Sequence, residues 1–304
     1  MSDLTDPTQA TSLSLNRRVF VGLSATAAAG GGTIAGALAQ GSDFGKPHPP
    51  IVPEQDPAIS VARPQVRYGA RTLDSYYASP RGAGRTTPGV VVVQAIWGID
   101  SQLRDTVRRF AKEGYIAIAP DLYTGLAAPS GDGATDFAPY RAVADKLADD
   151  VVDADLAAAA NFILQGAGGS PQKIGVVGFC MGGAITLRQT VDNAKIFSAA
   201  SVFYGKVRYG TTGNSGAITP IALDYAADIG VPTAGSWGSR DTSILADDVR
   251  ALDARLVQLK KPHDFFIYED AGHAFFDDTR DSYVAPAASD AWTRTLAWFK
   301  RYLA

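Results

Sequence analysis

The chain has one cysteine, Cys180, and three histidines, His48, His263 and His273, among its 304 residues. A single cysteine excludes an intrachain disulfide and a metal cluster built from several cysteines. The 28 Lys and Arg residues do not outnumber the 31 Asp and Glu residues, so no excess of positive charge favours nucleic acid binding. With 46% hydrophobic and 19% charged residues, the composition is typical of one sizeable globular domain.

The first 39 residues predict an export signal rather than part of the fold. Arg17 and Arg18 precede an uncharged stretch that runs to Ser42 and contains a typical cleavage site at residues 37–39. The arginine pair resembles a twin-arginine signal, which implies the twin-arginine export machinery as a partner and a periplasmic or secreted protein. The alternative is an uncleaved membrane anchor, although several glycines make the stretch weakly apolar.

Residues 40–65 are rich in proline and polar residues and show no hydrophobic periodicity. This composition predicts an extended linker or arm, with the folded domain spanning residues 66–304. His48 lies in this stretch between Pro47 and Pro49, and we expect it to have no catalytic role.

Beyond the arm, short apolar runs alternate with stretches of helical periodicity. Such an alternation is typical of an α/β fold, here one mostly parallel, doubly wound sheet with helices on both faces. Strands are expected at residues 66–77, 90–94, 116–119, 174–177, 199–204, 233–237 and 265–268. Helices are expected after Asp100 and at residues 142–164, 184–189, 246–259 and 286–303.

Cys180 lies in the sequence GFCMG, between a predicted strand and a predicted helix. The spacing G-x-C-x-G is the nucleophile-elbow pattern with Cys in place of Ser, in which a sharp turn exposes the central side chain above the sheet. A helix N-terminus behind a thiol lowers the pKa of the thiol and stabilises an oxyanion. The alternative is a buried structural cysteine, because free cysteine is often part of a core.

Thiol catalysis needs a base and a group that orients the base. Cys180, Asp241 and His273 each follow a predicted strand, and they occur in the chain order of the α/β-hydrolase triad. His263 precedes its strand and is a poor candidate for the base. Asp241 has the alternative role of capping the next helix, and His273 that of a surface-loop histidine held by a nearby acid.

The predicted oxyanion hole combines the Met181 N–H with an N–H from the loop after the strand at residues 90–94, for which we select Ile96. Trp97 and Tyr123 are expected to line the substrate pocket, with a role at its rim as the alternative. Together these residues predict hydrolysis of an ester by a cysteine nucleophile.

Several ordered motifs resemble the dienelactone hydrolase family from about Val66 to the end of the chain. They are QAIWG at residues 94–98, PDLY at 120–123, GFCMGG at 178–183 and YEDAGH at 268–273. The resemblance implies an α/β-hydrolase fold and a Cys-His-Asp triad that cleaves esters or enol lactones. It implies neither a metal nor an organic cofactor.

The chain departs from this family at three positions. Ala95 stands where family members with lactonase activity have a glutamate that is thought to hold the resting thiol. Gly125 and Asp277 stand where they have arginines that bind the substrate carboxylate. Without those cations, charge-assisted recognition of a carboxylate is lost, so we expect a neutral ester or lactone. We also expect a more persistent thiolate–imidazolium pair at Cys180.

Two other functions fit the same residues. A hydrolase fold that binds without turnover is one, because a fold alone does not define a function. Labelling of Cys180 by an alkylating probe distinguishes it from an enzyme. Acyl transfer to an acceptor other than water is the other, and product analysis with added alcohols or amines distinguishes it from hydrolysis.

Overall fold

A computed structural model of the chain describes residues 33–40, 44–166, 173–207 and 223–304. Most of the export signal predicted over residues 1–39 therefore lies outside the described residues. Among the residues described, no helix has the length and apolar character needed to cross a membrane.

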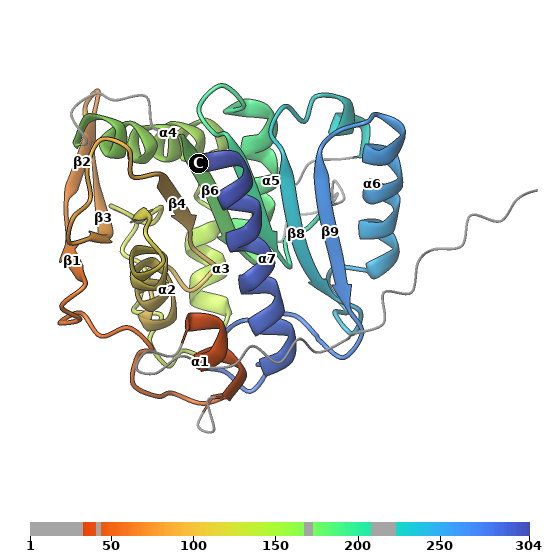
Figure 1. Ribbon diagram of the computed structural model, residues 1–304, viewed down its shortest axis with the longest axis horizontal. Helices are drawn as coiled ribbons and strands as arrows, with labels where there is room; N and C mark the ends of the chain where they lie inside the picture. Colours follow the sequence, from red (N-terminus) through yellow and green to blue (C-terminus); the bar gives the residue numbers. More distant parts are fainter. Residues whose placement is uncertain (1–32, 41–43, 167–172, 208–222) are drawn as a thin grey trace, which may run out of the picture. The chain divides into compact units, whose positions relative to one another are not determined.

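The strands form one sheet in the order β1-β3-β5-β4-β6-β7-β8-β9, with β2 paired to β3 (Figure 1). Neighbours from β4 to β9 run parallel, whereas β1, β2 and β5 pair antiparallel with β3. The strand bounds are β1 Ile59–Ala62, β2 Gln65–Tyr68, β3 Arg71–Pro80, β4 Gly89–Val93, β5 Ile116–Pro120, β6 Ile174–Phe179, β7 Ala199–Phe203, β8 Thr233–Gly238 and β9 His263–Tyr268.

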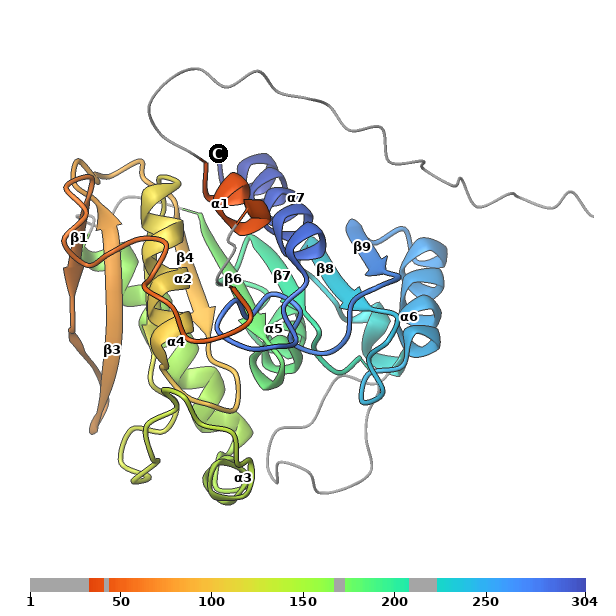
Figure 2. The same ribbon diagram turned by 90° about the horizontal axis from the view of Figure 1, so that it is seen from below.

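Helices cover both faces of the sheet, with α2 and α7 on one side and α4 and α5 on the other (Figure 2). The helix bounds are α1 Ile34–Gln40, α2 Ser101–Lys112, α3 Ala138–Ala144, α4 Asp149–Gly166, α5 Met181–Asp192, α6 Ala246–Gln258 and α7 Ala285–Leu303, with a 3₁₀ turn at Leu223–Ala227. This arrangement confirms the predicted α/β fold, a mostly parallel sheet with helices on both faces (Figure 2).

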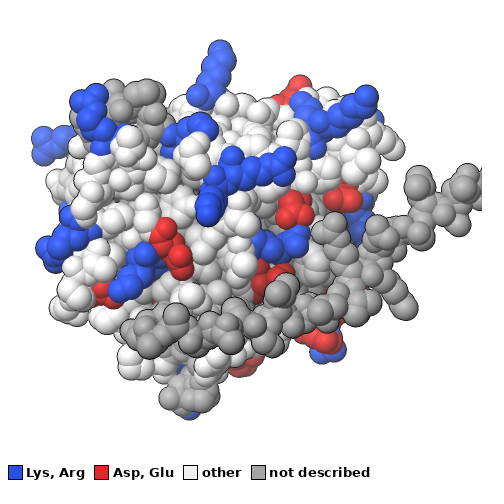
Figure 3. All heavy atoms as spheres, viewed as in Figure 1, with Lys and Arg blue, Asp and Glu red and all other residues white. Residues whose placement is uncertain are grey.

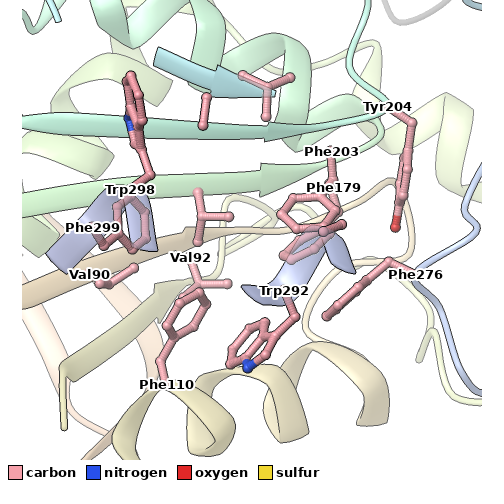
Figure 4. Close-up of a cluster of buried hydrophobic side chains, with 14 of the residues drawn as sticks. Val90, Val92, Phe110, Phe179, Phe203, Tyr204, Phe276, Trp292, Trp298 and Phe299 are labelled. Carbon is pink, nitrogen blue, oxygen red and sulfur yellow. The ribbon is translucent and has the colours of Figure 1, made fainter. Parts of the chain in front are cut away.

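The central strand β4 shows why the sheet needs two layers of helices. Its residues 89–93 are all buried. Because successive side chains of a strand point to opposite faces, Val90 and Val92 join one core cluster and Val91 and Val93 join the other. Figure 4 shows the first of these clusters, in which aromatic side chains from α2 and α7 pack beside Val90 and Val92.

The folded domain begins well before residue 66, so the predicted boundary is wrong. Within the stretch expected to be an arm, Ile59–Ala62 forms β1, which pairs with β3 in the main sheet. Val52 and Ile59 are 1% exposed and belong to the core. A four-residue strand at a sheet edge is too short for periodicity to reveal, and the prolines around it obscured it further.

Helix α1, apart from its last residue Gln40, lies within the residues predicted to be the export signal, and it packs against α7. Its Ile34 and Leu38 side chains are buried, and the Ser289 hydroxyl donates a hydrogen bond to the Ala35 carbonyl at 2.8 Å. The part of the predicted signal next to the cleavage site is therefore folded onto the domain.

On the face shown in Figure 3, Lys and Arg side chains are scattered among Asp and Glu side chains rather than gathered into one patch.

Candidate active site

Cys180 sits at a sharp turn between β6, which ends at Phe179, and α5, which begins at Met181. Its backbone has φ 55° and ψ −115°, a strained conformation for a residue with a side chain. Glycines are required beside it because the chain passes so closely: a Cβ at Gly178 would lie 2.1 Å from the Gly182 carbonyl oxygen, and one at Gly182 would lie 2.4 Å from that of Gln94.

The turn brings Cys180 into contact with a histidine and an aspartate from the ends of two other strands. His273 Nε2 lies 3.0 Å from Cys180 Sγ, and His273 Nδ1 lies 2.7 Å from Asp241 Oδ2. Cys180 is partly exposed and lines a cavity, so it is not a packed structural thiol. His263 lies at the opposite end of its strand, against the Lys261 carbonyl.

Asp241 uses its two oxygens differently. Oδ2 faces His273, while Oδ1 accepts hydrogen bonds from the Ser243 N–H at 2.8 Å, the Ser243 hydroxyl at 2.7 Å and the Ile244 N–H at 3.0 Å. Helix α6 begins two residues after Ile244, with Leu245 at its N-cap. The alternative that Asp241 only caps this helix is therefore wrong: the carboxylate orders the preceding turn and also binds the imidazole.

The charges of the cysteine and the histidine stabilise each other. Burial alone would raise the pKa of the Cys180 thiol, but the nearby His273 outweighs burial and lowers it. Burial alone would lower the pKa of His273, but Cys180 and Asp241 outweigh it and raise that pKa. Both pKa shifts favour a thiolate–imidazolium pair. Burial alone would raise the pKa of Asp241, but His273 outweighs burial and lowers it, which favours the ionised carboxylate beside the pair.

Met181, one of the two residues selected for the oxyanion hole, contacts the thiol through its backbone. A hydrogen bond from the Met181 backbone N–H lowers the pKa of Cys180 further, so this donor is directed at the sulfur. Ile96, the other selected residue, is buried in the turn after β4 and is not among the residues that line the cavity. The Tyr123 hydroxyl donates to the Ile96 carbonyl at 2.9 Å and so fixes the position of that turn.

Trp97 lines the cavity as expected, but Tyr123 does not. Tyr123 is 4% exposed, and its ring packs under the turn against Gly98 while its hydroxyl is bound to Ile96. Tyr123 follows β5 and therefore lies at the end of the sheet where the cavity is, as the sequence predicts. The turn after β4 covers its side chain and separates it from the cavity.

The cavity above Cys180 has a volume of about 590 Å³. The Phe137 ring lies 4.4 Å from that of Trp97, and the Arg280 guanidinium lies 4.2 Å from the Trp97 ring centroid. Sequence reasoning missed several lining residues, because they come from loops without a motif: Asp100, Phe137, Tyr204, Arg280 and the segment 45–47.

Two buried carboxyl groups and one guanidinium belong to the cavity wall. Asp100 caps α2 by accepting from the Leu103 N–H at 2.9 Å, and burial together with the nearby Asp277 raises the pKa of Asp100 to about 7. Burial also raises the pKa of Asp277. Arg280 donates from Nε to Asp277 at 2.9 Å and from an η-nitrogen to the Ala134 carbonyl at 2.7 Å. Gly125, the other position where the family resemblance implied an arginine, does not line the cavity.

Within the described ranges, His, Cys, Asp and Glu side chains form no group of three or more that could hold a metal ion.

A largely parallel sheet, a strained strand–turn–helix elbow and a histidine after the last strand define an α/β-hydrolase. Residues 73–303 match the family model described as "Dienelactone hydrolase family". The chain is 34% identical over 257 residues to a protein of Salmonella typhimurium named "Putative carboxymethylenebutenolidase", covering 84% of this chain and 92% of that one. A protein of the same name from Methylorubrum extorquens is 35% identical, covering 76% and 77%.

Solved structures agree with this assignment. The crystal structure of a "Putative Dienelactone Hydrolase" from Klebsiella pneumoniae superposes with a TM-score of 0.72 at 33% identity, covering 81% of this chain and all of that one. The chain therefore belongs to the dienelactone hydrolase family, within the α/β-hydrolase superfamily, and is a carboxylic ester hydrolase.

Proposed function

We propose that this protein hydrolyses neutral carboxylic esters or lactones through a thioester on Cys180. The observation that carries the proposal is the continuous set of contacts from Sγ of Cys180 through the imidazole of His273 to Asp241, at 3.0 and 2.7 Å. These distances are within hydrogen-bond reach, as proton transfer between nucleophile and base requires.

The reaction follows from the charges of Cys180, His273 and Asp241. The Cys180 thiolate attacks the substrate carbonyl, and the oxyanion that forms is stabilised by the N–H groups of Met181 and Ile96. The imidazolium of His273 protonates the departing alkoxide, which leaves a thioester. His273, now neutral, takes a proton from water, and the hydroxide formed attacks the thioester. The acid product leaves, and thiolate and imidazolium are restored. Asp241 fixes the tautomer of His273 throughout.

The charges in the cavity support a neutral substrate. The cavity is lined by two cations, Lys46 and Arg280, and by three carboxyl groups, those of Asp100, Asp277 and Asp281. The Arg280 guanidinium is already paired with Asp277, so a substrate carboxylate would meet more acids than cations there. The aromatic rings of Trp97 and Phe137 offer contact to an apolar group instead.

The central test uses p-nitrophenyl acetate with wild type, Cys180→Ser, Cys180→Ala and His273→Ala. We expect either alanine substitution to reduce kcat by about 10³ or more, because the triad acts as a unit. Unchanged turnover in either alanine variant would exclude the mechanism. Absence of turnover in the wild type, with Cys180 unreactive to an alkylating probe, would favour a binding protein.

A separate experiment tests the proposed preference for uncharged substrates. We expect kcat/KM for p-nitrophenyl acetate to exceed that for mono-p-nitrophenyl succinate, which carries a carboxylate. Asp277→Asn removes one negative charge and should raise kcat/KM for the succinate several-fold, with less change for the acetate. An equal change for both esters would show that Asp277 does not act through its charge.

We also propose that the protein is exported through the twin-arginine machinery. The proposal is supported by Arg17 and Arg18 and by the uncharged stretch that follows them. Replacing both arginines by lysine should leave the protein in the cytoplasm, which cell fractionation measures.

A further inference from the structure

We propose that His48 is a positioning residue, which holds residues 44–52 (the strap) against the domain as one wall of the substrate cavity. In this position the strap determines how large an ester reaches Cys180. The inference rests on the proposed function for its substrate, but the contacts that carry it lie outside the triad.

The strap is part of the cavity wall. Gly45, Lys46 and Pro47 line the same cavity as Cys180 and His273. The Gly45 N–H donates to the Asp278 carbonyl at 2.8 Å, and Gly45 has φ 95°, a conformation that favours glycine. The chain therefore turns sharply where it meets the loop after His273, and it continues along the cavity.

The hydrogen bonds of His48 require its charged form. Nδ1 lies 2.6 Å from the Pro49 carbonyl oxygen, and Nε2 lies 3.1 Å from that of Asp278. A carbonyl oxygen only accepts hydrogen bonds, so both ring nitrogens must donate, and only the imidazolium carries two N–H groups. The Asp278 carboxylate lies 3.6 Å from Nε2, and the Phe44 ring stacks on the imidazole at 4.3 Å. The side chain of His48 is 4% exposed.

The far end of the strap is attached to the same buried network. The Asp105 carboxylate of α2 accepts from the N–H groups of Ile51 and Val52, both at 2.9 Å. The fully buried Arg109 joins the two ends, because one η-nitrogen donates to Asp105 at 2.6 Å and to Asp278 at 2.5 Å. Both attachments of the strap therefore depend on Asp105, Arg109 and Asp278, which are not among the residues that line the cavity.

His48 should respond to pH within this network. The interaction with the Asp278 carboxylate is the largest effect and raises the pKa of His48, while burial and Arg109 oppose it. The charged groups that face it are Asp278, Asp105 and Arg109, and the adjoining recess is lined by Glu54, Arg104 and Arg108. The phenol ring of Tyr283 makes an edge contact with the Phe44 ring that stacks on the imidazole. A raised pKa means that the attachment is complete below the unfolded value of 6.5 and is lost as pH rises through the folded value.

The experiment compares the access of small and bulky reagents to Cys180. It measures the rates of alkylation by iodoacetamide and by a bulky N-aryl iodoacetamide, and kcat/KM for p-nitrophenyl acetate and p-nitrophenyl octanoate. The proteins are wild type, His48→Gln, His48→Arg and, as a matched control, His263→Gln. His263 also contacts a backbone carbonyl, but at the opposite end of the sheet.

The bulky-to-small ratio is the value for the bulky reagent or the octanoate divided by that for the small reagent or the acetate. We expect His48→Gln to raise this ratio at least threefold in both assays at pH 6. His48→Arg, which keeps the charge and several donors, should restore most of the wild-type ratio. In the wild type the ratio should rise with pH. In His48→Gln it should be high and should not change with pH. His263→Gln should match the wild type.

A bulky-to-small alkylation ratio in His48→Gln equal to that of the wild type, in folded protein, would overturn the inference. The alkylation assay needs no turnover. A shifted alkylation ratio in a protein that hydrolyses neither ester would therefore support the strap and refute the proposed function, so the two failures are distinguishable.

Discussion

At the scale of single residues, Asp241 combines a structural and a chemical role through its two oxygens. Asp241→Asn can keep the contacts of Oδ1 with Ser243 but places an amide where Oδ2 meets His273. We expect kcat to fall by about 10² to 10⁴, because the imidazole loses its orienting anion, with little change in melting temperature. Asp270→Asn is the control, since Asp270 is 82% exposed and pairs with Arg240. A matching loss in the control would contradict this role of Asp241.

The thiol of Cys180 should ionise at a lower pH than an ordinary thiol. His273 lowers the pKa of the thiol, and Ala95 provides no carboxylate to hold it protonated. The rate of alkylation by iodoacetamide should therefore follow an apparent pKa below the ordinary value of about 8.5. His273→Ala should move it upward. An apparent pKa near 8.5 in the wild type would show that the ion pair does not form in solution.

Asp100 should make stability depend on pH. Its pKa is raised from 3.8 to about 7, so the folded state holds a proton that the unfolded state releases. The free energy of unfolding should fall as pH rises between these values, by up to about 1.4 kcal/mol per pH unit from this group. Asp100→Asn keeps an N-cap but does not ionise. Urea unfolding from pH 4 to 8 should show a flatter profile for the variant, and parallel profiles would contradict the prediction.

At the scale of elements, the elbow between β6 and α5 depends on backbone contact. A Cβ at Gly182 would lie 2.4 Å from two carbonyl oxygens, those of Val93 and Gln94. Gly182→Ala must displace either α5 or the turn after β4, so we expect a loss of at least about 2 kcal/mol in stability and of most activity. Gly82→Ala is the control, because nothing lies within 4 Å of its Cβ position. Urea unfolding and ester turnover measure both effects.

The sequence predicted correctly the elements that a short stretch of neighbouring residues determines. The elbow needs glycines beside Cys180, and the valines of β4 need only to be buried on both sides. The strap and β1 were missed because their partners are distant in sequence: His48 binds Asp278, 230 residues away. The cavity residue Arg280 was missed for the same reason, since its contact with Trp97 exists only in the folded chain.

At the scale of the whole molecule, α1 links the predicted export signal to the stability of the domain. Cleavage after Ala39 would remove Leu38, which is 0% exposed, and Ile34, which is 6% exposed, from the core beside α7. Burying each side chain contributes about 1.5–3 kcal/mol, and ordering a short helix offsets part of it. A chain beginning at Thr33 should therefore be about 2 kcal/mol more stable than one beginning at Gln40, and Leu38→Ala in the longer chain should remove most of that difference. Urea unfolding compares the three proteins, and equal midpoints would mean that α1 adds no stability to the domain.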